Sequence, residues 1–144
     1  MIRLGIDFDN TIVEYDNLFN KIALEYKLID RKTKTNKIDL REILRSRGEE
    51  ELFTNIQGEV YGKRILEADS SKGVIAALKN LNYSEIKPFI ISHKTKTPYK
   101  GPKYDLHKAA RDWLTRNNFF NKDGLNWNKK DVYFEESKEK KIKR

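Results

Sequence analysis

Short apolar runs alternate with segments of helical spacing along this chain, and the alternation predicts its elements. Residues 2–8 form an apolar run that is too short for a helix and is bounded by polar residues. This pattern is typical of a buried strand in a parallel sheet. Residues 88–92 and 132–135 have the same character and predict two further strands.

Helical spacing fills the long interval between the first two strands. One helix is predicted to begin at Asp16, a second at Asp39, and a third over about residues 49–66. A fourth is expected to follow a cap formed by Ser70 and Ser71. These helices leave residues 30–37 as a polar loop.

Two more helices are predicted after the second and third strands. Asp105 is expected to cap the first of them and Ser137 the other, after a loop that covers residues 93–104. Strands that alternate with helices in this order are typical of an α/β domain with a parallel sheet.

Composition limits the class of protein further. A chain of 144 residues fits one domain, with room for a small insertion. It has no cysteine, which excludes disulfides and thiolate metal sites. The sequence shows neither a signal-peptide pattern nor an apolar stretch of the ~20 residues needed to cross a bilayer. We therefore expect a soluble cytoplasmic protein without a membrane partner.

The net charge of +8 raises the question of nucleic-acid binding. Against it, the lysines are spread along the chain and interleaved with acidic residues, and a positive field suits a small anionic substrate equally well. Residues 94–104 combine four lysines with two tyrosines and could hold a nucleotide or a nucleic acid. Nucleic-acid binding through this loop is kept as the less favoured alternative.

Polar residues gather at the end of each predicted strand. They are Asp7, Asp9 and Thr11 after the first strand, Ser92 and His93 at the second, and Lys138, Lys140 and Lys141 beyond the third. In open parallel sheets the functional sites lie at these carboxyl ends. Acids, a hydroxyl and a lysine in one place are the groups that phosphoryl transfer requires.

The motifs themselves resemble those of the haloacid dehalogenase-like superfamily. The string IDFDNT is similar to its first signature, D-x-D-x-T after the first strand, Ser92 matches the second signature, and FEESKEKKIKR matches the region of the third. The segments IQGEVYG, IISHKT, YDLHKAARDWL and VYFEESKEKKI are similar to one uncharacterised phosphatase branch. The resemblance covers nearly the whole chain.

The resemblance implies a role for each acid. Asp7 would be the nucleophile that forms an aspartyl-phosphate, and it would also bind Mg²⁺, the only cofactor expected. Asp9 would protonate the leaving group, then activate water, and would offer its backbone carbonyl to the metal. Thr11 would steady the loop around the two acids.

Further residues would act on the phosphoryl group or the substrate. Ser92 would hydrogen-bond the phosphoryl group, and Lys141 would neutralise charge beside the nucleophile because it directly precedes an isoleucine, with Lys138 as the alternative. The remaining expected substrate contacts are Asn10, His93 and Lys94.

The resemblance also implies an architecture and an activity. Residues 1–14 and 73–144 would form a Rossmann-like core with helices on both faces of its sheet, and residues 15–72 would form a helical cap. The activity implied is magnesium-dependent hydrolysis of a small phosphorylated metabolite. Phosphonate hydrolysis, dehalogenation and mutase chemistry are less favoured variants.

One signature is missing from the pattern. The superfamily places a fourth motif of one or two acids after a further strand, and this sequence stops at Arg144, before such a strand. We therefore expect a truncated reading frame with weak metal binding, since Mg²⁺ uses only one or two carboxylates. Glu135 and Glu136 are less favoured substitutes, and a non-catalytic anion-binding domain is the alternative function.

Overall fold

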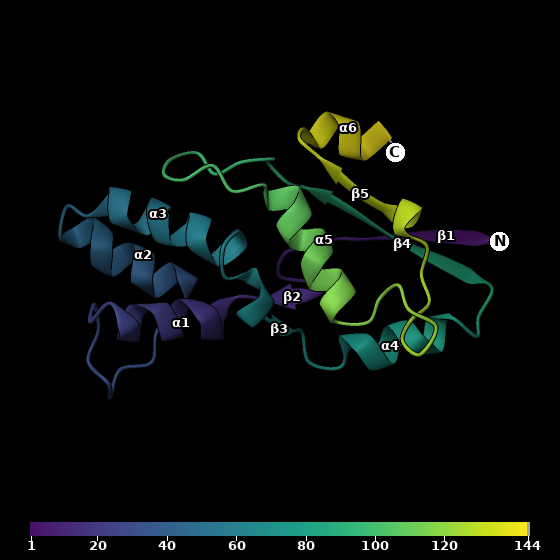
Figure 1. Cartoon of the computed structure of the whole chain (residues 1–144), viewed down its shortest axis with the longest axis horizontal. Coiled ribbons are helices and arrows are strands. Elements are labelled where there is room, and N and C mark those ends of the chain that lie inside the picture. The colour runs from purple at the N-terminus through teal and green to yellow at the C-terminus, as the bar shows by residue number, and fades with distance from the viewer. Residues whose placement is uncertain (144) are drawn as a thin grey trace.

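A parallel sheet and a group of three helices beside it form the framework of the protein (Figure 1). The computed structural model describes residues 1–143, without the side chains of Lys138 and Lys140. The sheet holds β1 (Ile2–Ile6), β4 (Ile86–His93) and β5 (Val132–Glu135) in the order β1-β4-β5. Both pairings are parallel, which confirms the predicted α/β class.

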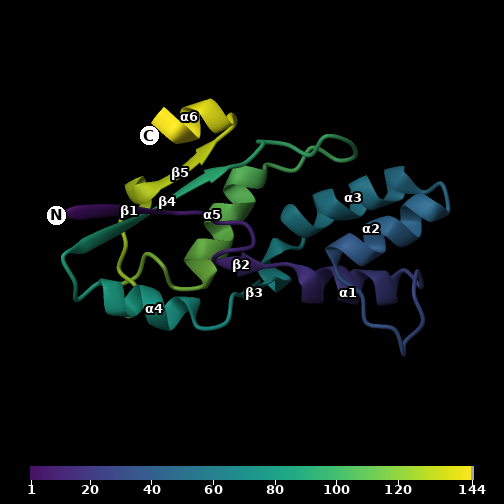
Figure 2. The ribbon, with the colours of Figure 1, turned by 180° about the vertical axis from the view of Figure 1, so that it is seen from behind.

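Helices connect the parallel strands and pack against them. Helix α4 (Val74–Leu81) precedes β4 and packs on it, α5 (Leu106–Arg116) joins β4 to β5, and α6 (Lys138–Lys143) packs on β4 and β5. In both views α6 lies on the other side of the sheet from α4 (Figures 1 and 2). This arrangement brings the carboxyl ends of the three strands to one edge.

The three remaining helices lie beyond that edge of the sheet. They are α1 (Asp16–Glu25), α2 (Lys37–Ser46) and α3 (Glu50–Tyr61), and they pack on one another (Figure 1). Phe19 of α1 stacks on Phe53 of α3 with ring centroids 6.0 Å apart. Helix α3 ends earlier than the sequence predicts, because Gly62 leaves the helical conformation and a separate 3-10 turn, η1 (Ile65–Glu67), follows.

A small antiparallel hairpin joins this helical group to the sheet, and the sequence did not predict it. Strand β2 (Val13–Glu14) pairs with β3 (Asp69–Ser70), so that Ser70 lies opposite Val13 instead of capping a helix. Helix α4 begins after Gly73, whose positive φ of 78° provides the turn. Strands of two residues carry no periodic signal, and only the tertiary pairing defines them.

Strand β1 is more exposed than predicted. Ile2 is 66% exposed and Leu4 is 41% exposed. Within residues 1–143, β4 is the only strand that pairs with β1. Side chains of a strand point to the two faces of the sheet and are buried only where helices cover those faces. Helix α4 packs on β4, and α6 packs on β4 and β5, so the prediction of a buried first strand is wrong for Ile2 and Leu4.

A buried aromatic cluster connects the sheet, α5 and the hairpin. Trp113 of α5 is fully buried, and its indole N–H donates to the carbonyl of Ala68 at 2.9 Å. Its ring meets Phe8 edge to face with centroids 5.7 Å apart. Phe8 is also fully buried, and its anchoring fixes the chain between Asp7 and Asp9.

None of the helices among residues 1–143 combines the length and apolar character that crossing a membrane would need.

One arginine connects α1, α3 and the 3-10 turn η1. The guanidinium of Arg64 donates to carboxylate oxygens of Glu25 in α1 and Glu67 in η1, each at 2.6 Å, and lies 3.7 Å from Glu59 in α3. These hydrogen bonds, with one from Lys21, lower the pKa of Glu67 to about 2.

Replacing this arginine should loosen the helical group measurably. We expect Arg64→Met to lower the free energy of unfolding by about 1–2 kcal/mol in urea denaturation at pH 7, because charged hydrogen bonds at a partly solvated site are lost. Arg31→Met, at an exposed position, is the matched control.

The pH dependence provides a second measurement on the same pair of proteins. The pKa of Glu67 is depressed from 4.5 to about 2 in the folded state. The stabilisation of the fold by its ionised carboxylate is therefore complete above pH 4.5 and is lost as the pH falls to about 2. The stability difference between the native protein and Arg64→Met should shrink over that interval. A difference that stays constant would contradict the assignment.

Candidate active site

The acid pair lies on a tight loop that follows β1. The backbone N–H of Phe8 donates to the carboxylate of Asp7 at 2.9 Å, and the carbonyl of Phe8 accepts the N–H of Ile12, also at 2.9 Å. Asn10 adopts the left-handed conformation with φ of 62°. With Phe8 pointing into the core, Asp7 and Asp9 both line the open cavity at the edge of the sheet.

This cavity brings together residues that are distant in the sequence. Its volume is about 470 Å³, and it is lined by Asp7, Asp9, Asn10, Ser92, His93, Lys141 and Ile142. Six of the eight predicted site residues are in this set. Thr11 is exposed and does not line the cavity, and Lys94 is buried and does not line it either.

Lys141 provides the positive charge nearest to Asp7 among the side chains that the structure describes. Its ammonium nitrogen lies 3.6 Å from an oxygen of the Asp7 carboxylate, which is 47% exposed. Helix α6 carries Lys141 and follows directly after β5. The side chains of the alternatives, Lys138 and Lys140, lie outside the described part.

The end of β4 contributes two residues of different character. Ser92 is almost fully buried, yet it reaches the cavity wall. His93 is exposed, and its Nε2 lies 3.0 Å from the carbonyl oxygen of Glu136. The histidine is therefore held by the backbone that leads into α6, and it remains a predicted substrate contact.

Lys94 makes a contact that the sequence did not predict. Its side chain is 4% exposed, and its ammonium nitrogen donates to both carboxylate oxygens of Asp9 at 3.1 Å. The backbone N–H of Lys94 donates to the backbone carbonyl of Glu135 at 2.9 Å. The backbone carbonyl oxygen of Lys94 lies 2.7 Å from Nε2 of His107. A buried lysine fixed in this way positions Asp9, and a substrate contact by Lys94 remains a prediction.

Two tyrosines complete the surroundings of Asp9. The hydroxyl of Tyr15 donates to the same carboxylate, and its ring packs against Tyr61 with centroids 4.7 Å apart. Burial, followed by the charge of Asp9, raises the pKa of Tyr15, which keeps the phenol protonated as a donor. No sequence motif distinguishes either tyrosine, because each is a single aromatic residue within an apolar pattern.

Metal donors at the cavity are few. Among the residues that the structure describes, no group of three or more histidines, cysteines, aspartates and glutamates could hold an ion. The carboxylate of Asp7 is an exposed oxygen donor on the cavity wall. Both carboxylate oxygens of Asp9 accept hydrogen bonds from Lys94, and its backbone carbonyl is the metal donor that the resemblance implies. Glu135 and Glu136 do not line the cavity.

Comparisons with known proteins do not assign the chain to a family. No protein-family model matches it, and no match was found among curated proteins or among solved structures. The evidence for a function therefore consists of the residues in the cavity and their geometry.

Proposed function

We propose that this protein is a magnesium-dependent phosphomonoester hydrolase of the haloacid dehalogenase-like superfamily, acting on a small phosphorylated metabolite through Asp7. The observation that carries the proposal is the convergence of Asp7, Asp9, Ser92 and Lys141 on one open cavity. In this interpretation residues 1–14 and 73–143 form the Rossmann-like core, with helices on both faces of the sheet, and Arg144, which the expected core included, lies outside the described residues. Residues 15–72 then form a helical cap.

Binding of the phosphoryl group follows from the charges at the cavity. The ammonium group of Lys141, beside Asp7, offsets the repulsion between the carboxylate and an incoming phosphate. The hydroxyl of Ser92 can donate a hydrogen bond to a phosphoryl oxygen from the end of β4. Together they hold phosphorus within reach of the nucleophile.

The reaction then proceeds in two steps at the acid pair. A carboxylate oxygen of Asp7 bonds to phosphorus while the bond to the leaving oxygen breaks, and protonated Asp9 gives its proton to that oxygen. Asp9 next takes a proton from water, which attacks phosphorus and releases phosphate and the free Asp7. The ion pair with Lys94 corresponds to the unprotonated form of Asp9 that activates water.

A magnesium ion would neutralise charge between the phosphate and Asp7. The carboxylate of Asp7 and the backbone carbonyl of Asp9 are oxygen donors of the kind that Mg²⁺ prefers, and the open cavity has room for the waters that complete its coordination. Two protein donors are a small set. The proposal therefore includes weak binding of the ion by residues 1–143.

Loss of the nucleophile provides the direct test of this function. We expect Asp7→Asn to reduce phosphate release from p-nitrophenyl phosphate by at least about 10³-fold, because the amide cannot form the covalent intermediate. Asp123→Asn, on the exposed loop that follows α5, is the matched control and should retain activity. Circular dichroism should show an unchanged fold. Full activity of Asp7→Asn would disprove the nucleophile, and phosphate binding without turnover by the native protein would favour the anion-binding alternative.

The positioning of Asp9 provides a second prediction. We expect Lys94→Met to lower kcat by about 10- to 100-fold, a part of what general acid–base catalysis contributes, while KM changes less. The acid then loses the buried cation that fixes both of its oxygens. Lys96, two residues further along the same loop, is exposed. Lys96→Met is the control, because it removes a positive charge from the loop without removing the ion pair to Asp9. Equal losses in both variants would show that the ion pair has no specific role.

A further inference from the structure

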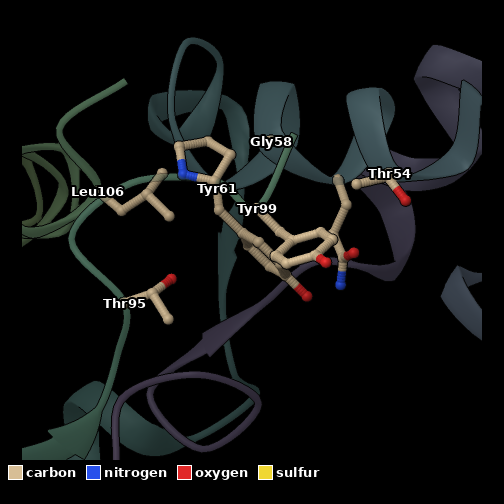
Figure 3. A pocket seen from close by; sticks show the side chains of 8 residues that line it. Thr54, Gly58, Tyr61, Thr95, Tyr99 and Leu106 are labelled. Atoms are coloured by element: carbon tan, nitrogen blue, oxygen red, sulfur yellow. The ribbon is translucent and has the colours of Figure 1, made fainter. Parts of the chain in front are cut away.

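A second hollow opens between α3 and the loop that follows β4 (Figure 3). Its volume is about 180 Å³, and we call it the α3 hollow. It is lined by Thr54, Gln57, Gly58, Tyr61, Thr95, Pro98, Tyr99 and Leu106, and none of these residues is charged. The cavity at Asp7 and Asp9, which we call the acid cavity, has a different lining, with two carboxylates and a lysine.

The lining of the α3 hollow favours a flat and largely apolar group. Tyr99 provides an exposed aromatic ring, and Pro98 and Leu106 provide aliphatic surface. The ring of Tyr61 already has the ammonium nitrogens of Lys37 and Lys94 over it, at 5.3 and 5.2 Å from its centroid. Thr54, Gln57 and Thr95 add neutral hydrogen-bonding groups. A neutral heteroaromatic ring can stack on Tyr99 and still use its polar edge.

Two buried side chains, Lys94 and Tyr15, lie between the α3 hollow and the acid cavity, and neither of them lines either one. The ammonium nitrogen of Lys94 lies 3.1 Å from Asp9 on one side and 5.2 Å from the ring centroid of Tyr61 on the other. Tyr15 bonds Asp9 through its hydroxyl and packs against Tyr61 with its ring. Lys94 and Tyr15 therefore each contact both Asp9 and Tyr61, which lines the hollow.

The chemistry of the proposed reaction fixes which part of a substrate points this way. Asp7 bonds to phosphorus, and Asp9 must reach the oxygen that leaves, so the leaving group extends from Asp7 past Asp9. The aromatic wall formed by Tyr61 lies just beyond Asp9 and the Lys94 that binds it. Exposed lysines of the same loop, Lys96 and Lys100, add a positive field that attracts anionic substrates.

We infer that the α3 hollow binds the leaving group of the substrate and that this group carries a planar heteroaromatic ring, as in a nucleoside 5′-monophosphate. The phosphate then lies in the acid cavity and the ring lies against Tyr99, with the pentose between them. This inference rests on the proposed function for the direction of the leaving group, and binding can be measured without turnover.

Binding to the inactive variant separates the base from the rest of the ligand. Asp7→Asn, in buffer with magnesium, is titrated with adenosine 5′-monophosphate and with ribose 5-phosphate, which lacks only the base. We expect the nucleotide to bind at least about 5-fold more tightly, since stacking on an aromatic side chain contributes about 1–3 kcal/mol per base. Equal affinities for the two ligands would overturn the inference.

A matched pair of tyrosines locates the binding. Tyr99 is 91% exposed and Tyr83, next to the end of α4, is 92% exposed, so truncation of either is compatible with folding. In the Asp7→Asn background, Tyr99→Ala should remove most of the preference for the nucleotide, and Tyr83→Ala should leave it intact. A preference that survives Tyr99→Ala, or that both variants lose equally, would overturn the assignment to this hollow.

The kinetics of the native protein distinguish the failure of this inference from that of the proposed function. A kcat/KM for adenosine 5′-monophosphate well above that for ribose 5-phosphate supports both. Hydrolysis of both compounds at the same rate overturns the inference and leaves the phosphatase function standing. Nucleotide binding that depends on Tyr99, without hydrolysis of any phosphate ester, supports the inference and contradicts the phosphatase function.

Discussion

The ion pair between Asp9 and Lys94 is the interaction on which the rest of the site depends. A buried lysine is destabilising unless a carboxylate meets it, and here Asp9 meets it with both oxygens. The pair joins the loop after β1 to the end of β4. Through Tyr15 and Tyr61 it also joins the sheet to α3. One contact thus orients the Asp9 carboxylate and connects the sheet to α3.

The parallel sheet explains why so much of the candidate site could be predicted. Parallel strands end at one edge, so residues that directly follow each strand must come close together whatever separates them in the sequence. Asp7 and Ser92 reach the same cavity for this reason, and Lys141 reaches it from α6, the short helix that follows β5. The apolar runs that define the strands are the clearest pattern in the sequence, and β5 begins and ends where its pattern does.

Features that depend on tertiary contact could not be predicted in this way. The partner of Lys94 lies 85 positions away, and a lysine among several others in a loop has no periodic signal. The β2–β3 hairpin consists of two-residue strands defined by their pairing alone. The exposure of Ile2 and Leu4 depends on whether helices cover the faces of β1, and the apolar pattern of the strand does not carry that information. The local sequence pattern therefore predicts helices and strands and where they end. Contacts between residues distant in the sequence form the surroundings of Asp9, and the pattern does not predict them.

A covalent bond between the side chain at position 7 and phosphorus is the central claim of this account. A crystal structure of the protein grown with magnesium and beryllium fluoride, a mimic of a phosphoryl group, tests it most directly. The account predicts the fluoride adduct on the Asp7 carboxylate, with the Lys141 ammonium and the Ser92 hydroxyl against its fluorines. A structure with no adduct on the Asp7 carboxylate, or with the adduct on another residue, would contradict the account.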